Sequence, residues 1–232
     1  MNSGASDPLT DIVAAARDHD AWVHVDGAFG LWAAASPALS HLVAGAGDAD
    51  SWATDAHKWL NVPYDCGVVA VRDRAAHVAA MGMTASYLVR TGDEARSNSD
   101  WVPEASRRGR GFAVYAALRS LGRDGVAELV ERCCTLARRL ASAVATADGV
   151  EVLNDVVLNQ VLLRFGADDA VTDAVIGRVQ ADGSCWVGGT RWHGRAAMRV
   201  SVSNWATTEA DIDRTAEAIV SAAALSAARP AS

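Results

Sequence analysis

An aspartate and a lysine each follow an apolar, strand-like stretch of this sequence, and together they suggest covalent cofactor chemistry. Asp26 ends the segment 22–26, WVHVD, and Lys58 comes shortly after the segment 51–54, SWAT. Ligands of open α/β sheets gather at the carboxyl ends of strands, so both side chains are expected at one crevice. A lysine amine in a partly desolvated pocket forms Schiff bases with aldehydes. Pyridoxal phosphate needs such an amine, and also an acid that keeps its pyridine nitrogen protonated.

Spacing alone does not decide between this chemistry and a purely structural role for the two residues. In the structural role, Lys58 is an exposed residue at a helix start and Asp26 caps the end of a strand. Isolated motifs of this kind often occur by chance. The surrounding sequence is therefore needed to choose between the two explanations.

The residues around the pair resemble a known enzyme family. The chain has HVDGA at 24–28, HKW at 57–59 and DC at 65–66. These segments resemble the group II pyridoxal-phosphate-dependent decarboxylases, which include the aromatic-L-amino-acid, glutamate, histidine and diaminobutyrate decarboxylases. The family pattern has alanine where this chain has Gly27. The likeness continues through TASYL, WVPEASRRGRGFAVYAALRSLG and RVSVSNWATTEADID, so it covers nearly the whole chain.

The resemblance implies a role for each residue near the cofactor. Lys58 is expected to bind pyridoxal phosphate covalently, Asp26 to pair with the pyridine nitrogen, and the Ala28 methyl to press on one face of the ring. His57 is expected beside the cofactor phosphate, where a ring N–H can donate a hydrogen bond, with a packing role as the alternative. His24 is expected to face the site from a second layer of residues.

The resemblance ties further positions to the cofactor phosphate. Asp55 matches a position where relatives often carry a polar residue on the phosphate side, but a carboxylate there repels the phosphate unless hydrogen bonds intervene. Ser106 matches a small residue that relatives bring to the phosphate from the neighbouring subunit, which implies a homodimer with shared active sites. Arg107 and Arg108 either assist at this place or form ion pairs at the start of a helix.

Tyr87 is the informative residue of a long polar segment, 83–105, that shows no helical or strand period. Long segments without secondary structure are usually functional or mobile. In the resembling family, a tyrosine on such a loop returns a proton to the substrate Cα in the partner's active site after carbon dioxide has left. A phenol suits this step because it keeps its proton at neutral pH. Related aldehyde synthases have phenylalanine instead, so Tyr87 favours simple decarboxylation.

Composition indicates a soluble, cytoplasmic α/β protein. The formal charge of −7 argues against a nucleic-acid partner, which would require a basic face. The apolar tail AIVSAAALSAA is too short to span a bilayer, and the first ten residues lack the pattern of a secretory signal. The four cysteines have no metal-ligand spacing, and the adjacent Cys133 and Cys134 are expected to pack as small hydrophobic residues.

Hydrophobic periodicity predicts two units joined by long helices. Helices are expected at 9–20, 73–81, 168–181 and 208–226, and from 106 to 147 with a break at Gly122 and Gly125. Strands are expected at AWVHVD, SWAT, GVEVLN, NQVLLRF, CWVGGTRW and AAMRVSVS, while CGVVAVRD is apolar enough to be buried in a parallel sheet. We divide the chain into a partial cofactor-binding domain (1–105), connecting helices (106–147) and a small α+β domain (148–232).

The implied fold is that of the fold type I pyridoxal-phosphate-dependent transferases, of which this chain has the second half of the large parallel-sheet domain. The part that the resemblance leaves unmatched would hold the phosphate-cradling loop and a histidine that stacks on the ring. The implied reaction is decarboxylation of an L-amino acid to the amine and carbon dioxide. Two alternatives stay open: another fold type I enzyme, such as an aminotransferase or desulfurase, or an inactive relic that dimerises with or regulates a full-length paralogue.

Overall fold

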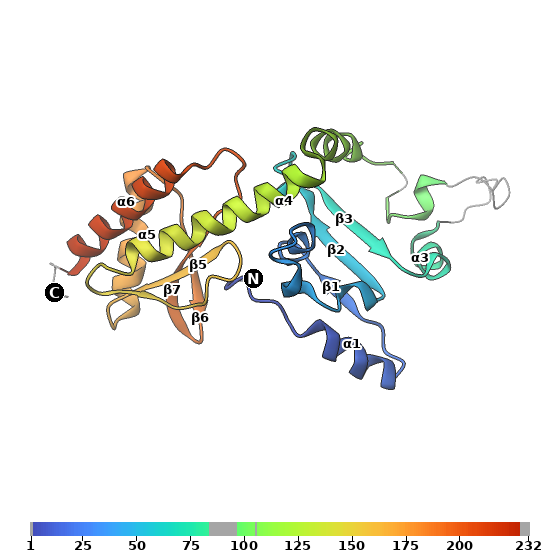
Figure 1. Ribbon diagram of the computed structural model, residues 1–232, viewed down its shortest axis with the longest axis horizontal. Coiled ribbons are helices and arrows are strands. Elements are labelled where there is room, and N and C mark those ends of the chain that lie inside the picture. The colour runs from blue at the N-terminus through green and yellow to red at the C-terminus, as the bar shows by residue number, and fades with distance from the viewer. Residues whose placement is uncertain (1, 84–96, 105, 228–232) are drawn as a thin grey trace.

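The computed structural model describes residues 2–83, 97–104 and 106–227 and shows two units connected by one long helix (Figure 1). The first unit contains a three-stranded sheet, and the second contains a four-stranded sheet with two helices. The connecting helix, α4 (Gly111–Val144), reaches from the first sheet across the second unit.

Short strands and turns build the first unit. Its α-helices and strands are α1 (Leu9–Asp18), β1 (His24–Asp26), β2 (Ser51–Asp55), α2 (Ala56–Trp59), β3 (Gly67–Val71) and α3 (Arg74–Met81). Four 3-10 turns lie at Gly30–Ala35, Ser40–Val43, Ala46–Asp48 and Asn98–Asp100. Helix α1 packs its one buried residue, Val13, against Val23 and Val25, which fixes the first strand beside the helix.

The first sheet has the order β1-β2-β3 and is mixed. Strands β1 and β2 are parallel, with Asp26 opposite Ala53, and β3 runs antiparallel to β2, with Gly67 opposite Asp55. The expected parallel position of the CGVVAVRD segment was therefore wrong. A parallel pair needs a crossover of a dozen or more residues, and the connection over residues 56–66 is shorter than that.

The same segment is exposed, although its apolar pattern is that of a buried strand. Val68 is 41% exposed and Val69 is 50% exposed, because no described element covers either face of β3. An apolar strand pattern is compatible with burial, but it does not specify which layers cover the strand.

Helix α4 changes direction at Gly122. That residue has φ 64° and ψ −174°, outside the helical region, in agreement with the predicted break. After the kink, the helix is buried along one side through Val130, Cys133, Cys134 and Leu140, which have no exposed surface. Before the kink, Phe112 projects its ring almost fully into solvent. In the described part of the chain, no helix has the length and apolar character needed to cross a bilayer.

The second unit matches the predicted α+β pattern. Its elements are β4 (Val150–Val152), β5 (Gln160–Phe165), α5 (Asp169–Asp182), β6 (Gly188–Trp192), β7 (Arg195–Ser201) and α6 (Glu209–Ala227). The strand order is β4-β5-β7-β6, with every neighbouring pair antiparallel. Helix α5 packs on β7 and α6, and α4 packs on α6 and β5, so the helices enclose the fully buried strand β5.

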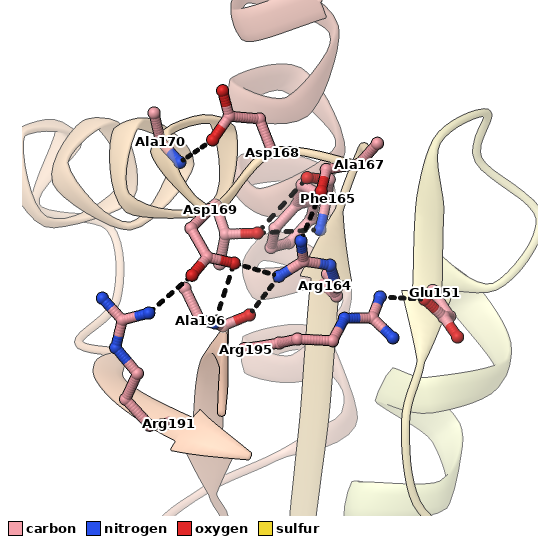
Figure 2. A network of polar contacts seen from close by, with 11 residues as sticks. Glu151, Arg164, Phe165, Ala167, Asp168, Asp169, Ala170, Arg191, Arg195 and Ala196 are labelled. Atoms are coloured by element: carbon pink, nitrogen blue, oxygen red, sulfur yellow. Dashed lines mark hydrogen bonds and ion pairs between the residues drawn. The ribbon is translucent and has the colours of Figure 1, made fainter. Parts of the chain in front are cut away.

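A polar network fixes the start of α5 to the sheet (Figure 2). The guanidinium of Arg164, only 3% exposed, donates to Asp169 Oδ1 at 2.7 Å and to the carbonyl oxygens of Ala167 and Ala196. Arg191 reaches the other oxygen of Asp169 at 2.5 Å. The hydrogen bond from Arg164, followed by that from the Ala196 N–H, lowers the pKa of Asp169 to about 2.

The first residues of the chain lie against the second unit, although they precede the first. The Asn154 side chain donates to the carbonyl oxygen of Ser3 at 3.0 Å, and the Thr190 hydroxyl donates to Asn2 Oδ1 at 3.2 Å. Gly4 has φ 76° and approaches Gln160 so closely that a Cβ would lie 2.6 Å from its Oε1. The two units are thus joined by this segment as well as by α4.

Candidate active site

Lys58 lies in a single helical turn that follows β2 directly. Its Nζ is 2.8 Å from Asp55 Oδ2 and 5.0 Å from the centre of the Phe29 ring. The lysine and aspartate side chains are 29% and 27% exposed. A carboxylate and an aromatic face thus hold the amine in a half-buried position.

Lys58 is the only lysine in the sequence, where the other 20 of 21 basic residues are arginines. Arginine stays protonated in proteins and cannot act as an amine nucleophile, whereas lysine can. The one position that keeps lysine is therefore the one at which nucleophilic chemistry is expected. The sequence analysis missed this signal, which a simple residue count would have found.

Asp26 ends β1 at the same sheet edge at which β2 leads into the lysine turn, because the two strands are parallel. Its Oδ1 accepts a hydrogen bond from the Ala28 N–H at 3.2 Å, and the carboxylate is otherwise exposed. The turn after it is tied to β2, since the Gly27 N–H donates to Ala53 O at 2.8 Å and the Thr54 hydroxyl donates to Gly27 O at 3.0 Å. These bonds fix the direction in which Asp26 leaves the strand.

Gly27 leaves no room for a side chain. A Cβ at this position would lie 2.4 Å from Leu31 Cβ and 3.2 Å from the carbonyl oxygen of Ala53. Ala28, the residue expected under the cofactor ring, follows it and is half-buried. The backbone of Gly27 and Ala28 is therefore closely packed between Asp26 and the 3-10 turn that begins at Gly30.

His57 is anchored by the segment that leads to β3. Its Nδ1 lies 3.1 Å from both the backbone nitrogen and the carbonyl oxygen of Cys66, so it accepts from the first or donates to the second according to the tautomer. Its Nε2 lies 4.0 Å from Asp55 Oδ2. The Tyr64 ring stacks on the imidazole with centres 4.3 Å apart. Nε2 thus lies on the side of Asp55, the partner of the Lys58 amine.

His24 lies two residues before Asp26 on the same face of β1. Its Nδ1 is 2.7 Å from the Ser51 hydroxyl, which also accepts from Trp22 Nε1. This contact holds the ring at the beginning of β1. Asp26 lies at the end of β1, and Lys58 follows the end of β2. Asp55, expected on the phosphate side, is paired with the lysine amine in this chain.

The segment before α4 places Ser106 in an exposed position beside three arginines. Arg107 donates to the carbonyl oxygen of Asn98, and Arg108 donates to that of Tyr64, both at 3.3 Å. Neither of these contacts is an ion pair. The Arg108 contact ties the segment to the loop between the lysine turn and β3, and the Arg107 contact ties it to the 3-10 turn Asn98–Asp100.

Arg110 is a residue that sequence reasoning missed. Its guanidinium makes paired contacts of 3.1 and 3.2 Å with the two carboxylate oxygens of Asp65, and it also donates to the Asp65 carbonyl. The backbone N–H of Asp65 and then Arg110 lower the pKa of this carboxyl group. The two residues line an open cleft of about 750 Å³ together with Gly67, Glu104 and Phe112.

Tyr87, the expected proton donor, lies outside the described residues. Its role therefore stays a prediction, as do the roles that the resemblance gives to the other site residues. Lys58, Asp55, His57 and Asp26 are gathered at one sheet edge, and Ser106 belongs to the segment that lines the neighbouring cleft.

The pyridoxal-dependent decarboxylase conserved domain matches residues 1–165 of the chain. The chain belongs to this family. Pyridoxal-dependent decarboxylases use pyridoxal phosphate, and the residues present fit that group. A lysine amine, a carboxylate and a turn too tight for a side chain meet at the end of two parallel strands.

Curated relatives of this decarboxylase-family chain include several plant and insect enzymes. It is 27% identical to 4-hydroxyphenylacetaldehyde synthase of Rhodiola rosea over 94% of this chain and 47% of the synthase. It is 27% identical to aromatic-L-amino-acid decarboxylase of Drosophila lebanonensis over 78% of this chain and 45% of the relative. The chain spans about half the length of these curated relatives.

Solved structures show the same fold. The crystal structure of Oryza sativa TDC with PLP and tryptamine aligns with a TM-score of 0.89 at 24% identity, covering 97% of this chain and 49% of that one. Mouse CSAD aligns with a TM-score of 0.87 at 23% identity, covering 96% and 50%. The chain therefore has the fold of the fold type I pyridoxal-phosphate enzymes over the half that it spans.

Proposed function

We propose that this chain provides the lysine-bearing half of a decarboxylase that converts an L-amino acid to its amine and carbon dioxide. The observation that carries the proposal is the position of the only lysine in the sequence, directly after β2 and at the same sheet edge as Asp26. Membership of the decarboxylase family favours this reaction over that of an aminotransferase or desulfurase.

Each residue has a defined task in the proposed reaction. When bound, pyridoxal phosphate accepts the electron pair that remains on the substrate as carbon dioxide leaves. Lys58 leaves Asp55 and holds the cofactor aldehyde through its amine, while Asp26 accepts a hydrogen bond from the protonated pyridine nitrogen. His57 donates from Nε2 to the phosphate, Ala28 supports the ring, and His24 keeps β1 in register through Ser51.

Two tasks belong to residues from a second subunit in the proposed enzyme. Ser106 binds the phosphate of the neighbouring site, and Tyr87 returns a proton to the substrate Cα. We therefore propose a homodimer with shared sites. We retain the division into residues 1–105, 106–147 and 148–232, and we propose a cytoplasmic location, which the four free cysteines support.

Cofactor capture tests the first half of the proposal. Purified chain is incubated with pyridoxal phosphate, reduced with borohydride and mapped by mass spectrometry. We expect a visible band that borohydride removes and a cofactor mass on the peptide that contains Lys58, both absent in Lys58→Ala. Failure to capture the cofactor would support the alternative, an inactive relic that dimerises with or regulates a full-length paralogue.

Product analysis of Tyr87→Phe tests the second half. Removal of one hydroxyl deletes the proton donor, so carbon dioxide should still be released while amine yield falls. Dioxygen and water are then consumed, and aldehyde, ammonia and hydrogen peroxide are formed in equal amounts with carbon dioxide. In mixed dimers, a Lys58→Ala subunit paired with a Tyr87→Phe subunit should regain one working site. An unchanged amine yield would assign Tyr87 to packing alone.

A further inference from the structure

Asn61 joins the lysine turn to the second unit. Its side-chain nitrogen donates to the carbonyl oxygens of Trp59 at 2.8 Å and Ser203 at 3.0 Å. Its Oδ1 accepts from the Trp205 N–H at 3.4 Å. One half-buried amide thus bonds both the end of α2 and the loop that follows β7, residues 142 positions away in the sequence.

The lysine turn depends on such external contacts. Helix α2 has four residues. A helix this short does not form by itself, because the free-energy cost of nucleation exceeds the stabilisation that a single turn provides. At its beginning, the Ala56 N–H donates to Cys66 O at 2.9 Å. At its end, Asn61 adopts a left-handed conformation, φ 52°, which asparagine tolerates better than most residues and which aims its amide back at the turn.

The loop that Asn61 contacts is itself held by α4. Arg132 donates to the carbonyl oxygens of Thr207 at 3.0 Å and Trp205 at 2.9 Å. A continuous series of hydrogen bonds therefore runs from α4 through this loop to the turn that carries Lys58.

We infer that Asn61 is a positioning residue, through which the loop 203–207 of the second unit sets the position of the Lys58 amine. The inference rests on the proposed function, in which Lys58 captures pyridoxal phosphate. Asn61 does not touch the amine, and it acts by fixing the end of the turn from which Lys58 projects.

Two substitutions separate the effect of the Asn61 side-chain amide from the effect of its backbone conformation. Asn61→Gly keeps the left-handed conformation available and removes the amide. Asn61→Asp keeps the shape but removes the donor and faces a carboxylate to two carbonyl oxygens. Asn154→Ala is the matched control, since Asn154 also bonds across the units, to Ser3, but has no contact with the lysine turn.

The measured quantity is the rate constant with which the Lys58 amine of the full chain is modified. One arm uses pyridoxal phosphate with borohydride, and the other uses formaldehyde with borohydride, which does not require a cofactor site. With no other lysine present, the mass of the Lys58 peptide reports this amine alone. Thermal unfolding of each variant shows whether a rate change follows general stability.

We expect cofactor capture to fall about fivefold in Asn61→Gly, the equivalent of one net hydrogen bond, and at least as much in Asn61→Asp. Asn154→Ala should lower the unfolding temperature without changing either rate. Arg132→Met should give a smaller loss of the same sign, and its effect should disappear when Asn61 is already glycine. Equal rates in parent and Asn61→Gly, or equal losses in Asn154→Ala, would overturn the inference.

Failure of the proposed function would look different. In that case the parent chain captures no pyridoxal phosphate, and the formaldehyde arm still decides the role of Asn61. A change in Lys58 methylation in Asn61→Gly and not in Asn154→Ala would keep Asn61 as a positioning residue. Equal rates of Lys58 methylation in the parent chain, Asn61→Gly and Asn154→Ala would show that Asn61 does not position the amine.

Discussion

The Nζ of Lys58 lies 2.8 Å from Oδ2 of Asp55, three residues earlier in the chain. The proposed cofactor attachment therefore begins with an exchange of partners, because an amine held in an ion pair has no free electron pair with which to attack an aldehyde. In this proposal, Asp55 orients the amine before the reaction, and its carboxylate then has to tolerate the incoming phosphate.

Asp55→Asn should accelerate capture of pyridoxal phosphate by Lys58. The amide keeps a hydrogen-bond acceptor near the amine but removes the charge that pairs with it and repels the phosphate. We expect the rate constant to rise about two- to fivefold at neutral pH, in line with the modest strength of half-exposed ion pairs. Stopped-flow absorbance at low and high salt measures this rate constant for cofactor capture. A slower reaction would show that Asp55 is needed as a base.

Asp26→Asn should retain cofactor capture and lose most of the decarboxylation. An amide cannot accept the pyridine proton as a carboxylate does, so the ring is a weaker electron acceptor. The loss of a charge-assisted hydrogen bond corresponds to about a 10- to 100-fold lower kcat. Release of labelled carbon dioxide measures the effect. Activity within threefold of the parent would exclude Asp26 from the site.

Gly27→Ala should destabilise the turn, even though alanine is the residue of the family pattern. The new Cβ would meet Leu31 Cβ at 2.4 Å, and overpacking of this kind costs about 1–3 kcal/mol. Leu31→Gly removes the obstacle, because it deletes the Leu31 Cβ, so the double variant should be more stable than the sum of the two single effects predicts. Urea unfolding of the four chains tests this, and additive effects would contradict it.

Acid should weaken the start of α5 through Asp169. The folded-state pKa of about 2 lies below the usual value of 3.8, so the unfolded chain binds protons first as the pH falls. The stability that Asp169 contributes is fully present above pH 4 and is lost as the pH falls towards 2. Asp169→Asn should therefore be less stable than the parent at pH 7, and the difference should shrink below pH 4. Unfolding temperatures across this range test the sign.

Cys133 and Cys134 should resist thiol reagents in the folded chain. Burial raises the pKa of Cys133 to about 11 and that of Cys134 to about 12. At pH 8, only about one thiol in a thousand or fewer is then the reactive thiolate. We expect the half-buried Cys185 to react first with Ellman's reagent, and the adjacent pair only after unfolding. Early labelling of the pair would show that α4 opens locally.

Much of this architecture was predictable, because its helices and most of its strands repeat apolar residues with the period of the element. The segment 67–71 was predicted as a strand but placed wrongly. Its apolar run is the same whether neighbours cover it or not, and only the short connection to β2 fixes its direction. The 3-10 turns between residues 30 and 48 leave no apolar period to read.

Candidate site residues could be predicted where the chemistry restricts the residue type. Lys58 and Asp26 were singled out because few other side chains can serve pyridoxal phosphate; the structure places both at one sheet edge, and their roles stay predictions. The pairing of Arg110 with Asp65 was not predicted, since three arginines in five residues offer equal candidates. The role of Asn61 depends on a partner 142 residues away, which no local pattern encodes.

The docking of residues 2–4 on the second unit has a consequence for synthesis on the ribosome. Ser3 reaches its partner Asn154, and Asn2 its partner Thr190, only after most of the chain has been translated. During that interval β1 and β2 can already pair, since they are close in sequence. Residues 2–4 are therefore translated long before the residues that hold them, and they dock on the second unit only after its sheet has formed.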